Sequence, residues 1–168
     1  MNTFRRGVLL CLLLLATAGC DRVTKHYAMV TLAGGPSHSY LGDTVRLDYH
    51  ENPGGFLSLG ATWESRTRAV VFQLANGAFL LVALVMAYRY RWSRLAAIGL
   101  IVFIAGGLSN LIDRMAIGTV IDFLSLGFGP FRTGIFNVAD VAIMAGVALL
   151  LVDRSVSSRK RAGSTRDM

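Results

Sequence analysis

Apolar residues fall in four long blocks along the chain, and polar or glycine-rich segments separate the blocks. A helix must supply roughly 20 mostly apolar residues to cross the hydrocarbon core of a bilayer. Four segments meet this requirement and predict membrane-spanning helices at about residues 7–28, 69–88, 95–112 and 136–152. The first block is the least uniform, because its apolar part ends at Cys20 and is followed by Asp21, Arg22 and Lys25.

The composition supports a membrane protein. Of the 168 residues, 54% are hydrophobic and 16% are charged, whereas about a quarter of the residues in a soluble domain are charged. We predict one polytopic membrane domain over residues 1–153. Residues 154–168 form a polar, basic tail, and this composition is typical of disorder.

Basic residues gather on one side of the four predicted spans. Ten of the 17 Lys and Arg residues lie before the first span, between the second and third, or after the fourth: Arg5, Arg6, Arg89, Arg91, Arg94, Arg154, Arg159, Lys160, Arg161 and Arg166. Positive residues in short segments stay in the cytoplasm, so both termini are predicted there. This arrangement accounts for the net charge of +7 without a nucleic-acid partner.

Two segments are then expected outside the membrane. In residues 29–68, Val45, Leu47 and Tyr49 alternate with polar residues, which indicates a half-buried strand. The fold class expected is therefore an all-α membrane protein of four helices, with a small extracytoplasmic β-sheet between the first and second helices. Residues 113–135 are rich in glycine and contain Pro130, so they are predicted as a loop with a short strand around 119–123.

Polar side chains occur at the outer ends of three predicted spans and in the loop between the last two. They are Asp21 and Lys25, then Asn110, Asp113 and Arg114, then Asp122, and finally Asn137 and Asp140. Within each helix the spacing is three or four residues, which places the side chains on one face. Gly106 and Gly107 lie one turn before Asn110 and would let another helix approach closely.

Several of these residues have purely structural interpretations. Asp21 and Lys25 can form an ion pair, Asp113 and Arg114 can cap a helix end, and the asparagines can link helices. Asp122 and Asp140 lie in apolar sequence without a basic residue nearby. Desolvation and mutual repulsion favour one shared proton on such a pair. The residue pattern alone is compatible with a catalytic dyad, a proton relay or a packing feature. With a relay, the protein would be a non-enzymatic scaffold or proton-conducting subunit.

Five short motifs follow one another along nearly the whole chain. They are Asp21-Arg22-Val23-Thr24-Lys25, Asn52-Pro53-Gly54-Gly55-Phe56, Gly106-Gly107-Leu108-Ser109-Asn110-Leu111-Ile112-Asp113-Arg114, Val120-Ile121-Asp122-Phe123 and Phe136-Asn137-Val138-Ala139-Asp140. Together they resemble the motif set of bacterial lipoprotein signal peptidase (signal peptidase II), an aspartyl peptidase family. The motif from Asn52 to Phe56 departs from the family's commoner N-x-G-A-A-F form, because it is one residue shorter.

The resemblance implies an aspartic endopeptidase of the bacterial inner membrane, with its active site near the periplasmic face. Its substrates would be diacylglyceryl-modified prolipoproteins, cut just before the lipidated cysteine, and its other partner would be membrane lipid. The family's catalytic aspartates correspond to Asp122 and Asp140. Its supporting residues correspond to Asp21, Lys25, Asn52, Asn110, Asp113, Arg114 and Asn137. The resemblance implies no metal and no cofactor.

The stretch "LLLATAGCDRVTK" around Cys20 allows another interpretation, since an apolar run ending in small residues and a cysteine is typical of a lipoprotein signal peptide. Cleavage before Cys20 would leave Asp21 and Lys25 on a lipid-tethered stub. We therefore interpret the stretch as part of an intact first helix.

Overall fold

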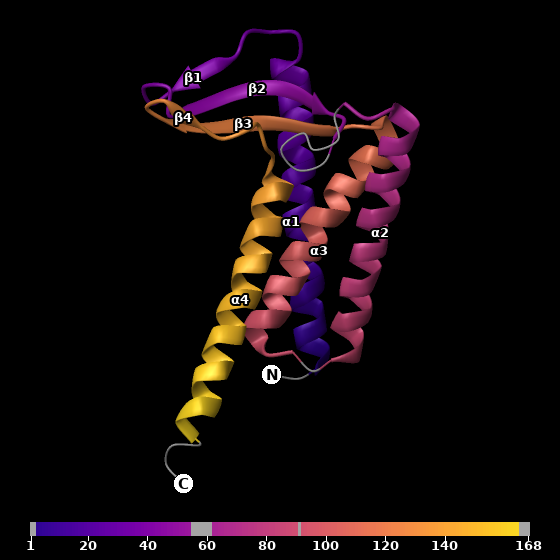
Figure 1. The fold of residues 1–168 in the computed structure, drawn as a ribbon, viewed down its shortest axis with the longest axis vertical. Helices are drawn as coiled ribbons and strands as arrows, with labels where there is room; N and C mark the ends of the chain where they lie inside the picture. Colours follow the sequence, from indigo (N-terminus) through magenta and orange to yellow (C-terminus); the bar gives the residue numbers. More distant parts are fainter. Residues whose placement is uncertain (1–2, 55–61, 91, 165–168) are drawn as a thin grey trace.

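A computed structural model describes residues 3–54, 62–90 and 92–164 of the chain (Figure 1). The elements, in chain order, are α1 (Thr3–Leu32), β1 (His38–Tyr40), β2 (Val45–Asn52), α2 (Ser65–Arg89), α3 (Arg94–Ile117), β3 (Val120–Phe128), β4 (Phe131–Arg132) and α4 (Val138–Ser164). Gly55 and Phe56, the last residues of the second motif, lie outside the described residues.

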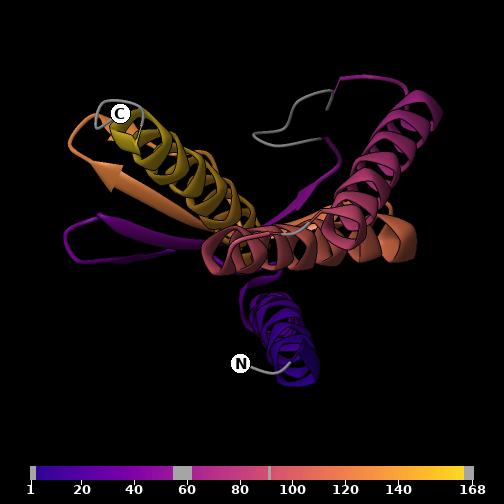
Figure 2. The same cartoon turned by 90° about the horizontal axis from the view of Figure 1, so that it is seen from below.

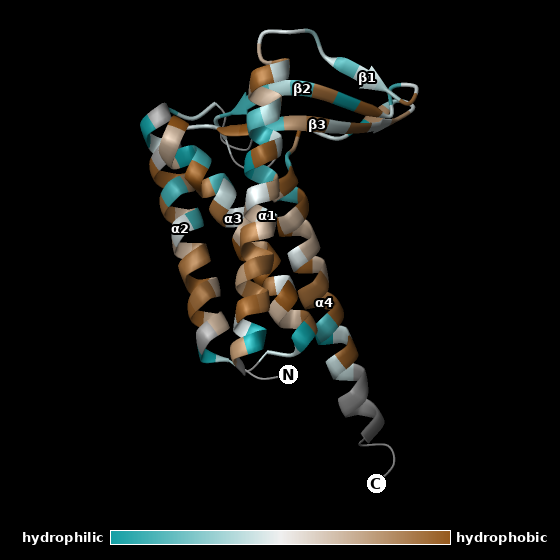
Figure 3. Cartoon of the chain, turned by 180° about the vertical axis from the view of Figure 1, so that it is seen from behind, coloured by the Kyte–Doolittle hydropathy of each residue, from teal (hydrophilic) through white to brown (hydrophobic). Residues whose placement is uncertain are grey.

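Each of the four predicted spans corresponds to a helix. Within the described residues, four helical segments are long and apolar enough to cross a membrane: Phe4–Leu32, Val70–Ala87, Arg94–Ile117 and Val138–Ser158. Their outer faces are apolar and exposed, as at Leu74 (67% exposed) and Leu81 (61% exposed), and Figure 3 shows hydrophobic residues along the length of the helices. Exposed apolar surface of this extent is what a lipid environment requires.

Helix α3 is the centre of the bundle, since it contacts α1, α2 and α4. Figure 2 shows α1 on one side of α3 and both α2 and α4 on the other. The predicted role of the two glycines is confirmed. A Cβ on Gly106 would collide with the Ala139 carbonyl oxygen of α4, and one on Gly107 would lie 2.7 Å from a methyl group of Leu80 on α2. Helix α4 therefore approaches α3 at Gly106 as closely as only glycine permits, and Gly107 leaves room for the Leu80 side chain of α2.

A four-stranded antiparallel sheet in the order β1-β2-β3-β4 lies across the end of the bundle where α1 and α3 end (Figure 1). The sheet differs from the prediction, because it takes strands from both connecting segments and not only from the segment between the first two helices. Strand β3 runs well beyond the expected 119–123. Gly129 and Pro130 occupy the turn between β3 and β4, so these two turn-forming residues do not interrupt the strand.

Strand β3 places Asp122 opposite His50 of β2, and Val120 opposite Asn52. Asp122 is therefore held on a strand that pairs with its neighbour, and it lies within the short strand expected around 119–123. The pairing also brings Asn52, at the end of β2, next to the same part of the sheet.

Helix α4 continues to Ser164, so residues 154–164 are helical where the sequence predicts disorder. The segment from Arg154 to Ala162 contains neither glycine nor proline. Adding a residue to an existing helix is much easier than starting a new one, which is why a polar sequence can extend α4.

Candidate active site

The polar residues predicted from the sequence meet beneath the sheet, where the ends of α1, α3 and α4 come together. The structure buries Asp21, Lys25, Asn52, Asn110, Asp113, Asp122 and Asn137, and it partly buries Arg114 and Asp140. Helix α1 is continuous through Cys20, and its buried residues Asp21 and Lys25 follow closely after this cysteine.

Asp140 lies in the first turn of α4. One carboxylate oxygen accepts a hydrogen bond from Asn110 Nδ2 at 2.9 Å, and the other accepts one from the Asn137 backbone N–H at 3.2 Å. In return, the Asp140 backbone N–H donates to Asn137 Oδ1 at 2.9 Å. This reciprocal exchange between two residues three apart is a capping box. It fixes Asp140 at the start of the helix.

Asp122 is only 2% exposed. Its carboxylate accepts hydrogen bonds from Asn137 Nδ2 at 2.6 Å and from Asn52 Nδ2 at 3.0 Å. Burial is the main reason that the pKa of Asp122 rises to about 6, and the negative charge of Asp140 acts in the same direction. The amides of Asn52 and Asn137 and the charge of Lys25 act in the opposite direction. The neutral form of Asp122 is therefore accessible near neutral pH.

Asn137 connects the two aspartates. Its side-chain amide donates to Asp122, and its backbone N–H donates to Asp140. The two carboxylates, which are far apart in the sequence, are thus arranged around a single residue at the start of α4. The amides that contact these aspartates come from Asn52, Asn110 and Asn137, three of the supporting residues that the resemblance implied.

Lys25 stands behind this arrangement and is almost fully buried. Its Nζ lies 2.7 Å from Asp21 Oδ2, 2.7 Å from Asp113 Oδ2 and 2.7 Å from Asn110 Oδ1. Because the oxygen of the Asn110 amide accepts from Lys25, the nitrogen of the same amide faces Asp140. The lysine therefore determines which way the Asn110 amide points.

Asp21 joins three helices. Its carboxylate accepts from Ser109 Oγ of α3 at 2.7 Å and from the Ala139 backbone N–H of α4 at 2.8 Å. The second contact satisfies one of the free N–H groups at the start of α4. Ser109 is a buried residue of this site that the sequence analysis did not assign. The sequence feature that could have identified Ser109 is its position four residues before Asp113, on the same face of α3.

Asp113 and Arg114 do not form the helix-ending pair that the sequence allowed. Asp113 contacts Lys25 and Arg22. Arg114 instead donates to the backbone carbonyls of Gly54, at 2.9 Å, and of Asn110, at 3.4 Å. Its guanidinium also lies over the ring of Phe72, 5.9 Å from the centroid.

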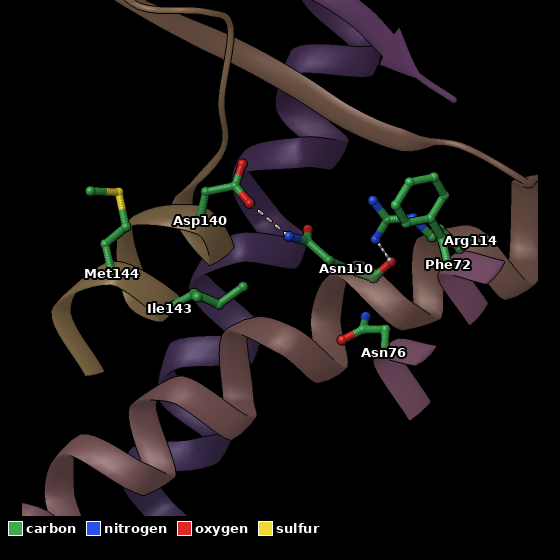
Figure 4. Close-up of a pocket in the computed structure, with 7 residues that line it drawn as sticks. All are labelled: Phe72, Asn76, Asn110, Arg114, Asp140, Ile143 and Met144. Carbon is green, nitrogen blue, oxygen red and sulfur yellow. Dashed lines mark hydrogen bonds between the residues drawn. The ribbon is translucent and has the colours of Figure 1, made fainter. Parts of the chain in front are cut away.

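A cavity of about 270 Å³ opens beside Asp140 (Figure 4). Its lining comes from α2, α3 and α4: Phe72, Asn76, Asn110, Arg114, Asp140, Ile143 and Met144. The sequence analysis did not identify the α2 contribution. The available signal was an amide side chain, Asn76, inside an otherwise apolar span.

The geometry can be compared with known proteins. A family model described as signal peptidase (SPase) II matches residues 13–156. The lipoprotein signal peptidase of Methylorubrum extorquens (strain PA1) is 34% identical over 98% of this chain and 94% of the relative. That of Desulforapulum autotrophicum is 34% identical over 90% of this chain and 93% of the relative.

The fold is also found among solved structures. One described as a bacterial membrane enzyme superposes with a TM-score of 0.76 at 22% identity, covering 89% of each chain. A second, with the same description, has a TM-score of 0.76 at 23% identity and covers 86% of this chain and 90% of the other. With a family match over most of its length and relatives above 30% identity, this chain belongs to the signal peptidase II family, a family of aspartic peptidases of bacterial membranes.

Proposed function

We propose that this chain removes the signal peptide from diacylglyceryl-modified prolipoproteins, and that Asp122 and Asp140 are its catalytic pair. The cut falls just before the lipidated cysteine. The observation that carries this proposal is the arrangement of two carboxylates around Asn137, one of which, Asp140, lines a cavity between apolar helices. Family membership supports the substrate class.

The hydrolysis needs one ionised and one protonated carboxyl group. The ionised group takes a proton from a water molecule as the water oxygen attacks the scissile carbonyl carbon. The protonated group gives its proton to the carbonyl oxygen. In the second step a proton passes to the leaving nitrogen and the C–N bond breaks. The products are the carboxyl end of the signal peptide and the free amino group of the lipidated cysteine.

The raised pKa of Asp122 suits this chemistry, because a carboxyl group with a pKa of about 6 can be protonated near neutral pH. The proton belongs to the pair, since two interacting carboxyl groups titrate together. The supporting residues position the pair and the cavity wall: Asp21, Lys25, Asn52, Asn110, Asp113, Arg114 and Asn137. The reaction consumes one water molecule, and the two carboxyl groups accept and return the protons that move.

We further propose that the sheet and the active site face the periplasm and that both termini lie in the cytoplasm. The chain ends and the connection between α2 and α3 lie at the end of the bundle opposite the sheet (Figure 1). Arg5, Arg6, Arg89 and Arg94 are on this opposite end. Positive residues in short segments favour the cytoplasmic side, which supports this orientation.

The cavity supports a placement of the substrate between α2 and α4. Ile143, Met144 and Phe72 give it apolar walls for the signal peptide and the acyl chains, and Arg114 offers a cation for the polar part near the sheet. Because the cavity lies on the face of α3 away from α1 (Figure 2), a substrate embedded in the bilayer would enter from that side.

The test is cleavage of a lipidated prolipoprotein by purified variants in detergent. Asp122→Asn and Asp140→Asn should each lower the rate by at least about a hundredfold, because each removes one half of the acid–base pair. Asp48→Asn is the matched control, since it changes a carboxylate of β2 that lies outside the site. Substantial activity in either site variant, in a protein that still unfolds cooperatively, would refute the proposed pair.

A further inference from the structure

Helix α2 carries two amide side chains one turn apart, and only one of them reaches the cavity. Gln73 and Asn76 are the two strongly polar residues in the span Val70–Ala87. Gln73 Nε2 donates to the Arg114 carbonyl oxygen at 3.0 Å, and Asn76 Nδ2 lies 3.5 Å from the Gly107 carbonyl oxygen. Both contacts connect α2 to α3, but Asn76 alone also lines the cavity.

The Asn76 amide is held only weakly by the protein. Its 3.5 Å contact is at the upper limit of hydrogen-bond length. Among the residues that the structure describes, this is the one hydrogen bond of the Asn76 side chain. The amide oxygen and the second N–H are thus available to a ligand in the cavity.

Asn76 lies deeper in the bundle than the aspartates. Gly107, its contact on α3, is three residues before Asn110, which corresponds to about 4.5 Å along the helix axis. Figure 4 likewise shows Asn76 farther from the sheet than Asn110 and Asp140. A substrate group bound by Asn76 therefore lies on the cytoplasmic side of the scissile bond in the proposed orientation.

A polar side chain at this depth is expensive in a membrane, which makes it a candidate for function. A peptide bond can be hydrolysed only after its carbonyl and the neighbouring groups leave the hydrogen bonds of a helix. The last turn before such a break exposes several backbone groups without partners. In an apolar cavity each of these groups needs a partner from the enzyme.

On the basis of the proposed function, we propose that Asn76 binds the main chain of the signal peptide on the N-terminal side of the scissile bond. The Asn76 oxygen accepts from a peptide N–H, and its nitrogen donates to a peptide carbonyl. A side-chain amide carries both an acceptor and a donor, so it can bind the N–H and the carbonyl of the peptide main chain. The ester groups of the lipid offer only acceptors, and the glycerol portion lies at the level of the headgroups.

The first experiment compares two substitutions of similar shape, Asn76→Leu and Gln73→Met. Initial rates are measured against the concentration of a lipidated prolipoprotein peptide in detergent. Asn76→Leu should raise KM by about tenfold to a hundredfold, the effect of leaving a buried peptide group unpaired. The kcat of this variant should change by less than about threefold, because the change does not touch the acid–base pair. Gln73→Met should change KM by less than about twofold, because Gln73 does not line the cavity.

The comparison separates binding from a merely structural tether. Gln73 makes the shorter of the two contacts with α3, so a tether alone predicts that Gln73→Met is at least as harmful as Asn76→Leu. That result would overturn the proposal, as would a loss of kcat at unchanged KM. Full activity in Asp140→Asn would instead contradict the proposed catalytic pair, and the effect of Asn76→Leu on KM is measured independently of it.

A second experiment varies the substrate, so that its first comparison uses the unaltered enzyme and does not depend on the folding of a variant. Peptides carry an N-methyl group at one of the three peptide bonds before the scissile bond, which removes that N–H. One of these peptides should show the raised KM with the wild-type enzyme and no further rise with Asn76→Leu, since both changes remove the same hydrogen bond. Equal cleavage of all three peptides and the parent would overturn the proposal.

Discussion

Removing the charge of Lys25 should be among the most damaging single changes to this protein. The Nζ of Lys25 lies 2.7 Å from Asp21 Oδ2 and 2.7 Å from Asp113 Oδ2, and the three side chains are at most 3% exposed. Lys25→Met leaves two buried carboxylates without this partner. Breaking a buried ion pair by removing one member lowers the free energy of unfolding by about 3–5 kcal/mol.

Thermal unfolding in detergent measures this loss. For a chain of this size we expect Lys25→Met to lower the midpoint by about 6–20 °C. Arg46→Met is the control, because Arg46 and Asp43 are both more than a third exposed and an exposed pair contributes little. Its midpoint should stay nearly unchanged.

A double variant tests whether charge is the cause. Adding Asp21→Asn to Lys25→Met removes one of the stranded charges, while the oxygen of the new amide can still accept a hydrogen bond from Ser109 or from the Ala139 backbone N–H. The double variant should therefore be more stable than Lys25→Met alone. An unfolding midpoint for Lys25→Met equal to that of the wild type, or losses in the double variant that simply add, would refute the reasoning.

Three further predictions follow from other parts of the structure. Gly106→Ala should lower both stability and activity, because its Cβ would collide with the Ala139 carbonyl oxygen, whereas Gly19→Ala, with nothing within 4 Å, should be harmless in the same unfolding and cleavage assays. Folding raises the pKa of Asp122 from 3.8 to about 6, so the folded state holds this proton more tightly. The contribution of Asp122 to stability should accordingly be complete below pH 3.8 and be lost by about pH 6, and unfolding of Asp122→Asn across this range should lack that contribution. The intact mass of the purified protein should match the full chain of 18.2 kDa, and loss of residues 1–19 with an added diacylglyceryl group would contradict an intact α1.

The sequence was sufficient for the helices and for the common level of Asn110 and Asp140 in the bundle. Four apolar blocks were long enough to be assigned as spans, and the positions of Asn110 and Asp140 at the ends of their blocks placed them at one level. Hydropathy does not report which side of a span faces the protein. This is why Asn76 was not recognised as a cavity residue, although its amide is unusual within an apolar span.

Strand pairing between distant parts of the chain was the second feature that the sequence could not predict. The ladder between β2 and β3 joins residues about 70 apart in the chain, such as Asn52 and Val120, and this pairing allows the side-chain hydrogen bond from Asn52 to Asp122. Local patterns carry no signal for such contacts, and the glycines around residue 129 pointed towards a loop. The contact from Asp21 to the Ala139 backbone N–H has no sequence signature, since every residue except proline has that group.

The charges around Lys25 also bear on the biogenesis of the protein. Asp21, Arg22 and Lys25 give the outer part of α1 one excess positive charge, and Asp113 on α3 supplies the negative charge that Arg22 and Lys25 contact. The chain is synthesised from its N-terminus, so α1 is made before α3. Until α3 docks, the charges of Arg22 and Lys25 lack the Asp113 partner that they have in the folded protein. Docking of α3 therefore completes the neutralisation.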